Sequence, residues 1–181
     1  MTRAFTIIEL LVVMAIIIIL GGLILGTASY VQNKGKRSRA EAEIAALSAA
    51  LENYKADNGV YPSGTETNAL KPNGVGDPRD QKYKDASLAL YKAISGDADN
   101  DSNRTAESKS YFPFKPNQLD PTTQTQAVTF IKDPFGFSYG YSTAKSSVPG
   151  GSDGYNPTFD LWSTGGDTSS SPAQAKWIKN W

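Results

Sequence analysis

An uncharged stretch of 24 residues, from Leu10 to Asn33, constrains this chain more than any other feature. Its first part, from Leu10 to Leu25, contains only aliphatic side chains, Met14, Ala15 and two glycines. A helix of about 20 apolar residues is long enough to span the hydrocarbon core of a bilayer. The stretch therefore predicts a transmembrane helix segment over residues 5–33.

A secretory signal peptide is the competing interpretation of this stretch. Gly26, Thr27 and Ala28 resemble the small-residue cleavage site of such a peptide, but its apolar region would be shorter. Glu9 also argues against it, because a carboxylate at the start of an apolar segment costs free energy and brings no benefit to a signal peptide or an ordinary span. Glu9 is therefore the first candidate functional residue.

Helical spacing continues beyond the apolar stretch. One helix face carries an apolar stripe of Ala40, Ile44, Leu47, Leu51 and Tyr54. The pair Asn58-Gly59 is a typical helix terminator. The pattern predicts one long helix from Phe5 to Asn58, whose amphipathic half at residues 34–58 faces a core.

The rest of the chain predicts an α+β domain. Residues 62–127 are polar and rich in turns, with one short helix expected between Asp85 and Gly96. Residues 128–181 have strand patterns, in which aromatic or aliphatic side chains alternate with small or polar ones. We expect a small antiparallel β-sheet there, with its aromatic face covered by the apolar stripe of the long helix.

The composition excludes several classes of function. The 181 residues include no cysteine and no histidine, and 18 basic side chains balance 18 acidic ones. A disulfide framework, a thiolate or imidazole zinc site, and Ser-His-Asp or Cys-His catalysis are therefore excluded. A nucleic-acid-binding protein normally needs a basic face. We expect neither an enzyme nor a nucleic-acid partner.

Several motifs resemble a known family. Phe5-Thr6-Ile7-Ile8-Glu9 resembles the start of type IV pilin-like proteins, after the point where a short leader is cut. Further segments resemble the major pseudopilin of type II secretion: Leu51 to Pro62, Asp133 to Tyr141, Phe159 to Asp167, and Ile178 to Trp181. The resemblance covers roughly residues 4–62 and 130–181 and implies a pilin-like fold.

The family resemblance gives the N-terminus specific roles. Residues 1–4 would be a prepilin leader, cleaved between Ala4 and Phe5 by a prepilin peptidase that then methylates the Phe5 amine. Ala4 stands where glycine is usual. Glu9 would pair with the Phe5 amine of a neighbouring subunit, and this pairing would set the register of a helical homopolymer. The other implied partners are minor pseudopilins, an inner-membrane platform protein, an assembly ATPase and membrane lipid.

The resemblance also implies a location. The chain would cross the bacterial inner membrane once, with a cytoplasmic N-terminus and residues 34–181 in the periplasm. Counting basic residues favours the opposite orientation, because a basic cluster follows the span: Lys34, Lys36, Arg37 and Arg39. This cluster has two other interpretations, contact with acidic headgroups or acidic side chains of a neighbouring subunit, and a solvated helix face.

Calcium is the one candidate cofactor, at either of two loops. The resemblance implies a site at Asp167, with Ser163 and Thr164 as oxygen donors, although residues 168–181 contain no second acid. The second loop has alternate acids like the first half of an EF-hand: Asp97, Asp99 and Asp101. It lacks the glycine at the sixth position, so a polar surface turn is the alternative there.

The predicted function is that of a structural subunit of a type II secretion pseudopilus. It would polymerise through its N-terminal helix and drive protein export across the outer membrane. The alternative is a type IV major or minor pilin for adhesion, motility or DNA uptake, against which the absence of cysteine weighs. A membrane-anchored periplasmic domain that never polymerises would leave Glu9 without a role. Of the tryptophans, Trp162 is expected in the core, and Trp177 and Trp181 either in the core or between subunits.

Overall fold

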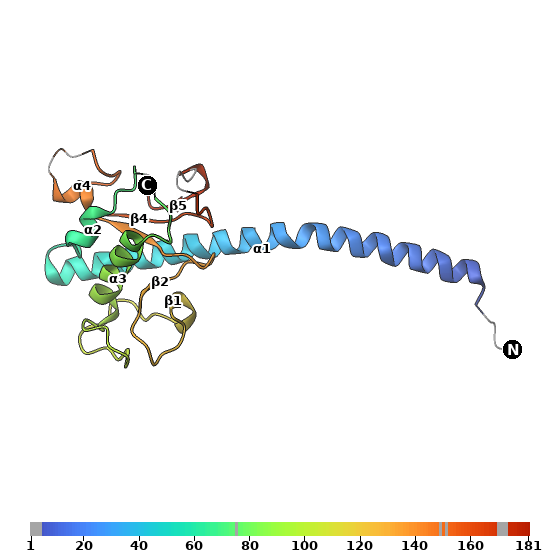
Figure 1. The fold of residues 1–181 in the computed structure, drawn as a ribbon, viewed down its shortest axis with the longest axis horizontal. Helices are drawn as coiled ribbons and strands as arrows, with labels where there is room; N and C mark the ends of the chain where they lie inside the picture. Colours follow the sequence, from blue (N-terminus) through green and yellow to red (C-terminus); the bar gives the residue numbers. More distant parts are fainter. Residues whose placement is uncertain (1–4, 75, 149, 151, 170–173) are drawn as a thin grey trace. The chain divides into compact units, whose positions relative to one another are not determined.

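The computed structural model describes residues 5–74, 76–148, 150, 152–169 and 174–181, without the side chains of residues 23–28. The chain forms two compact units, Met1–Lys36 and Arg37–Trp181. The boundary between them falls within helix α1 (Ile7–Asn58), which Figure 1 shows in blue to turquoise. The predicted leader, including Ala4 at the predicted cleavage point, lies outside the described residues.

Helix α1 is continuous over 52 residues, so the predicted long helix is confirmed to within two residues at its start. It ends at Asn58, where Gly59 has a φ of 79° and its N–H donates to the Lys55 carbonyl at 2.7 Å. Glycine adopts this left-handed conformation without steric cost, in agreement with the helix end predicted at Asn58-Gly59.

In the first unit, the large apolar side chains from Phe5 to Leu20 are 51–85% exposed. Where side chains are described, no helical segment is both long enough and apolar enough to cross a membrane.

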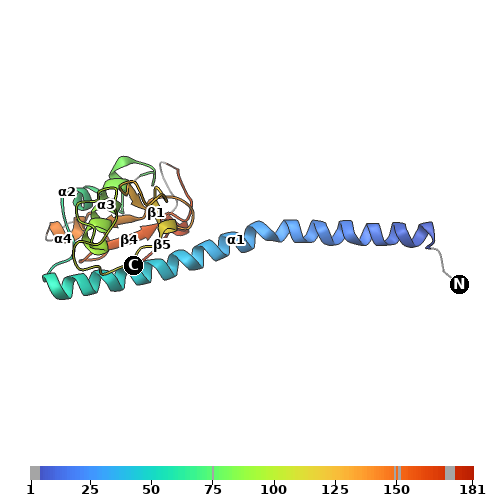
Figure 2. The same cartoon turned by 90° about the horizontal axis from the view of Figure 1, so that it is seen from below.

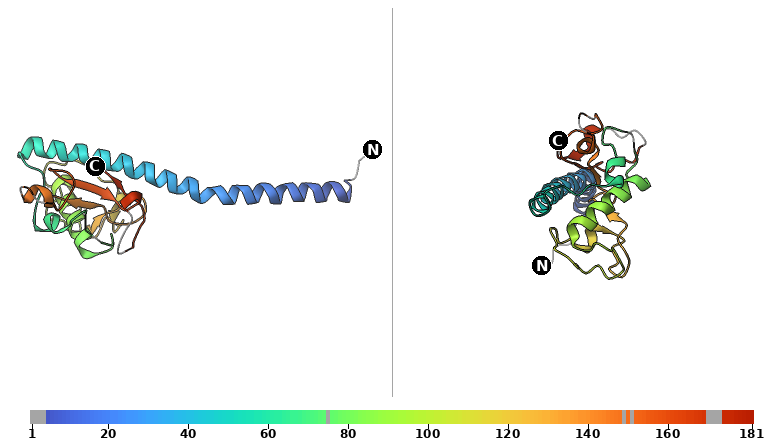
Figure 3. Two further views of the ribbon diagram at one scale, coloured as in Figure 1. Left: turned by 90° about the horizontal axis from the view of Figure 1, so that it is seen from above. Right: turned by 90° about the vertical axis from the view of Figure 1, so that its left-hand side faces the viewer.

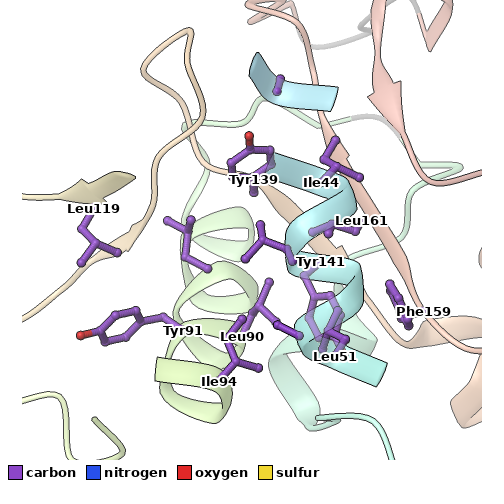
Figure 4. Close-up of a cluster of buried hydrophobic side chains, with 14 of the residues drawn as sticks. Ile44, Leu51, Leu90, Tyr91, Ile94, Leu119, Tyr139, Tyr141, Phe159 and Leu161 are labelled. Atoms are coloured by element: carbon purple, nitrogen blue, oxygen red, sulfur yellow. The ribbon is translucent and has the colours of Figure 1, made fainter. Parts of the chain in front are cut away.

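In the second unit, the amphipathic part of α1 supplies one side of the core. The stripe residues Ala40, Ile44, Leu47 and Leu51 are 0–4% exposed, as predicted. They share a cluster with Leu90 and Ile94 of α3 (Gln81–Ser95) and with aromatic and aliphatic side chains from the strands (Figure 4). Figures 2 and 3 show the other elements of this unit on one side of the helix.

Within the described residues, the strands form two small antiparallel sheets instead of the single predicted sheet. In the first, β1 (Leu119–Asp120) pairs with β2 (Phe130–Ile131). In the second, the order is β3 (Gly140–Ser142), β4 (Asp160–Ser163) and β5 (Ile178–Lys179). The two sheets stay separate because the turn after β2 leads only to an isolated bridge between Lys132 and Ser138. Helix α3 contacts β2 and β3 and so joins the sheets.

The middle region is more ordered than its composition suggested. Helix α3 begins at Gln81 and not near Asp85, because Asp80 has the extended conformation of an N-cap and its carbonyl accepts the first bonds of the helix. It ends at Gly96, with a φ of 88°, as predicted.

The described part of the second unit also contains four shorter helical segments: α2 (Thr65–Ala69), α4 (Ala144–Ser147) and the 3-10 turns Pro116–Gln118 and Gln174–Lys176.

The second sheet has the expected aromatic face and the expected face of small or polar residues, and both faces are buried. Tyr139 and Tyr141 enter the main core, while Gly140 between them lies against Trp162 of a second cluster. This second cluster consists of Leu70, Tyr83, Ala86, Trp162 and Trp177, with Trp181 partly buried against it. The core position predicted for Trp162 is confirmed, and the terminal tryptophans pack against the same ring.

Candidate functional site

The first candidate site is the start of α1, where Glu9 caps its own helix. The Glu9 carboxylate accepts hydrogen bonds from the Thr6 backbone N–H at 2.9 Å and from the Thr6 hydroxyl at 2.8 Å. In return, the Glu9 N–H donates to Thr6 Oγ1 at 3.3 Å. This reciprocal pattern is a capping box, which satisfies N–H groups that a helix start leaves unpaired. Glu9 therefore has a partner within a single subunit.

The Glu9 carboxylate stands beside an apolar hollow of about 370 Å³ lined by Phe5, Ile8, Glu9, Val12 and Val13. Phe5 is 85% exposed. Thr6 is a hydrogen-bond partner of Glu9 that the sequence interpretation missed. Its signal was present, because Thr followed three residues later by Glu, just before an apolar run, is the capping-box pattern.

The second candidate site is the C-terminal loop, which is organised around the buried carboxylate of Asp133. One oxygen accepts the N–H groups of Phe135 and Phe137 at 3.0 and 2.8 Å, and the other accepts the Ser163 hydroxyl at 2.5 Å. Ser163 Oγ also accepts the Gly165 N–H at 3.1 Å. Burial raises the pKa of Asp133, and these donors oppose that shift. The contact ties the end of β4 to the turn after β2.

Asp167 lies beyond two glycines in this loop. Its carboxylate accepts the Ser169 N–H and hydroxyl at 3.0 and 2.7 Å, and its other oxygen is 3.8 Å from the Lys176 ammonium. The Lys176 carbonyl in turn accepts a hydrogen bond from Arg37 at 2.7 Å. A lysine thus already provides positive charge to the predicted calcium ligand.

The donor set of this loop fits calcium poorly. Calcium takes six to eight oxygens, including carboxylates. Asp167 supplies one carboxylate, the Ser163 oxygen is engaged as both donor and acceptor, and Thr164 offers a buried hydroxyl without a hydrogen-bond partner. Within the described part of the chain, no three acidic side chains gather as a metal site would require.

The acidic loop after α3 places its three predicted ligands in different environments. Asp97 is buried and accepts the Tyr91 hydroxyl at 2.7 Å, whereas Asp99 and Asp101 are exposed and accept backbone N–H groups within the loop. The nearby Asp99 carboxylate is the main reason that the pKa of Glu107 is raised. Like charges therefore approach one another here, and Asp97 has a structural partner.

The basic cluster is partly committed to contacts within the second unit. Arg39 pairs with Glu43 at 2.8 Å, and Glu43 also accepts the Tyr139 hydroxyl at 2.8 Å. Arg37 holds the Lys176 carbonyl, as described above. At Arg37 and Arg39, contacts within the second unit therefore argue against the interpretation of the cluster as a purely solvated helix face.

Comparison with known proteins points to one family. The family model described as type II secretion system protein G matches residues 29–98. This segment contains the second half of α1, α2 and α3. The chain resembles protein G of type II secretion systems.

Two curated relatives are both named type II secretion system core protein G. The protein of Pectobacterium carotovorum subsp. carotovorum is 35% identical over 80 residues, which are 42% of this chain and 51% of the relative. That of Pseudomonas aeruginosa is 38% identical over 78 residues, 41% of this chain and 55% of the relative. No solved structure matches.

The predicted resemblance to the major pseudopilin is confirmed by these matches. The aligned part of the chain spans about half the length of each relative. Glu9 and the C-terminal loop lie outside the segment matched by the family model, so their roles stay predictions.

Proposed function

We propose that this chain is a structural subunit of a type II secretion pseudopilus, without a catalytic role. The observation that most directly supports this proposal is the match of residues 29–98 to protein G. The α+β fold, with α1 packed against small antiparallel sheets in the second unit, is consistent with it. Polymerisation through the N-terminal helix would drive protein export across the outer membrane.

We place residues 5–33 in the inner membrane, with the N-terminus in the cytoplasm and residues 34–181 in the periplasm. The uncharged stretch and the exposed apolar side chains of the first unit support this placement. A prepilin peptidase would remove residues 1–4 and methylate Phe5. Platform protein, assembly ATPase and minor pseudopilins are the further partners proposed.

The pairing proposed for Glu9 between subunits competes with the hydrogen bonds that Thr6 donates to Glu9 in the capping box. In the single subunit, Thr6 satisfies the carboxylate, so Glu9 enters an apolar environment at reduced cost. After cleavage, the Phe5 amine of a neighbour would offer a charged donor, which binds a carboxylate more strongly than neutral donors do. Exchange of partners would thus couple correct axial stagger to assembly.

The test replaces Glu9 and Thr6 separately in the full chain, expressed with the secretion machinery. We expect Glu9→Ala and Glu9→Leu to leave the subunit inserted and processed but to block filaments. Processing is followed by the mobility of the mature chain, and filaments by electron microscopy. Normal filaments from either variant would contradict the register role.

Thr6→Val is the matched control, because it removes the hydroxyl of the capping box and leaves the Glu9 carboxylate in place. We expect this variant to assemble. If Thr6→Val blocked assembly as completely as Glu9→Leu, the carboxylate would act through its helix cap and not through a neighbouring subunit.

Calcium binding is a separate proposal for the two acidic loops. Calcium bound only to the folded chain raises the melting temperature. Calcium binding at either loop would raise the midpoint relative to excess chelator, and Asp167→Asn or Asp99→Asn would then identify the loop responsible. An unchanged midpoint in the unsubstituted chain would contradict both sites.

A further inference from the structure

The loop that follows α3 carries a feature unrelated to assembly. The chain contains three Asn-x-Ser/Thr triplets, beginning at Asn100, Asn103 and Asn156. This triplet is the acceptor pattern for N-linked glycosylation, which takes place on surface loops of exported proteins. The three asparagines are in very different environments.

The environment of Asn103 suits a glycosylation acceptor. It is exposed, and its Nδ2 donates to Thr105 Oγ1, two residues on, at 2.8 Å. Arg104, between them, has a φ of 44°, which turns the chain so that the amide and the hydroxyl face each other. The Arg104 guanidinium also donates to the Gln126 and Pro121 carbonyls, both at 2.7 Å. The middle of the triplet is therefore anchored, while Asn103 and Thr105 on either side of it are exposed.

The other two asparagines are unsuitable. Asn100 is partly buried, and its amide donates to the Val128 carbonyl and accepts the Val128 N–H, both at 2.9 Å. Asn156 is followed by Pro157, which the acceptor pattern excludes, and its Nδ2 donates to the Phe159 carbonyl at 3.2 Å. These two amides serve the fold, and the amide of Asn103 does not.

We propose that Asn103 is an N-glycosylation acceptor for an oligosaccharide carried on a lipid diphosphate. The Asn103 Nδ2 forms a bond to the anomeric carbon of the first sugar. The bond from that carbon to the diphosphate oxygen breaks, and the lipid diphosphate leaves with the electron pair. One amide proton passes to a base of the transferase. Asp101, which is exposed and accepts the Asn103 N–H at 2.6 Å, adds a negative charge by which a basic transferase site can recognise the segment.

The test uses the purified full chain in non-ionic detergent, so it depends on neither membrane insertion nor filament assembly. The chain is incubated with a purified single-subunit bacterial oligosaccharyltransferase and its lipid-linked oligosaccharide. Intact-mass spectrometry and peptide sequencing then locate the product. We expect one mass increase, equal to one oligosaccharide, on Asn103.

Four variants make the result specific. Asn103→Gln and Thr105→Val should abolish the mass increase, whereas Thr105→Ser should keep it. Ser102→Ala destroys the triplet at Asn100 without touching the contacts of that side chain with Val128, and it should leave the modification unchanged. No mass increase while a control acceptor peptide is modified, or an increase that persists in Asn103→Gln, would overturn the proposal. Normal filaments from the Glu9 variants would not bear on the proposed glycosylation of Asn103.

Discussion

At the scale of single residues, and among the residues that the structure describes, two buried carboxylates of the second unit are held by backbone N–H groups and a hydroxyl. Asp133 accepts two N–H groups and the Ser163 hydroxyl, and Asp160 accepts the N–H groups of Tyr155 and Asn156 at 2.9 and 2.8 Å. Burial raises the pKa of both. Each acid thus provides acceptors for backbone N–H groups of a turn.

Ser163→Ala tests this arrangement through its pH dependence. A raised pKa means that the folded state holds the proton more tightly, so the contribution of Asp133 to the unfolding free energy is greatest below the unfolded pKa of about 3.9 and falls as pH rises through the folded pKa. Removing the hydroxyl raises the folded pKa further. We therefore expect a loss of about 1–3 kcal/mol at pH 7 and a smaller loss at pH 4.

Urea unfolding of the full chain in detergent, followed by tryptophan fluorescence, measures these losses. Ser152→Ala, at an exposed position, is the control and should change little at either pH. An equal loss from Ser163→Ala at both pH values would show that the hydroxyl does not act through the Asp133 carboxylate.

At the scale of elements, the second sheet depends on a close approach between β3 and β4. Gly140 and Trp162 are directly paired, and a Cβ on Gly140 would lie 2.2 Å from Trp162 Cε2. The Trp162 ring is also in edge contact with Tyr83 and stacks on Trp177. The indole therefore has no room to move away, and only glycine fits opposite it.

Gly140→Ala should consequently destabilise the second unit by about 1–3 kcal/mol through overpacking. Thermal unfolding measured by circular dichroism gives the loss, and a change in tryptophan fluorescence reports displacement of the ring. Gly35→Ala is the control, because it lies in α1 with open space around it and should stabilise the helix by up to about 1 kcal/mol. Unchanged unfolding of Gly140→Ala would mean that β3 and β4 separate easily.

At the scale of the whole molecule, the two units differ in how they satisfy their apolar surface. The buried hydrophobic residues of both clusters lie between Ala40 and Ile178, inside the second unit. The described apolar side chains of the first unit, from Phe5 to Leu20, have no core to enter. We therefore expect folding to depend on the second unit and the proposed association to depend on the first.

We expect residues 37–181, expressed alone, to unfold cooperatively, with a midpoint within a few degrees of that of the full chain in detergent. The full chain should partition into a detergent phase and the fragment should not, because only the full chain carries the exposed apolar helix. Circular dichroism and phase separation measure the two properties. A fragment without a cooperative transition would show that the first unit is needed for folding.

Some features of the site were open to prediction and others were not. The pairing of Thr6 with Glu9 is a short-range pattern, and the sequence contained its signal. The contact of Ser163 with Asp133 joins residues 30 positions apart, so no local spacing indicates it. The same holds for Arg37 and the Lys176 carbonyl, which are 139 positions apart. Among the three acceptor triplets, only burial distinguishes Asn103 from Asn100.

Local sequence was enough to predict α1, its apolar stripe and its end at Asn58-Gly59, because helical periodicity and left-handed caps depend on residues three or four positions apart. It also carried the resemblance to protein G. Folding of the second unit was needed to show that the described strands form two sheets, that both faces of the second sheet are buried, and that a lysine stands beside Asp167. These outcomes depend on which distant segments meet, and that is settled by packing of the whole unit and not by any local pattern.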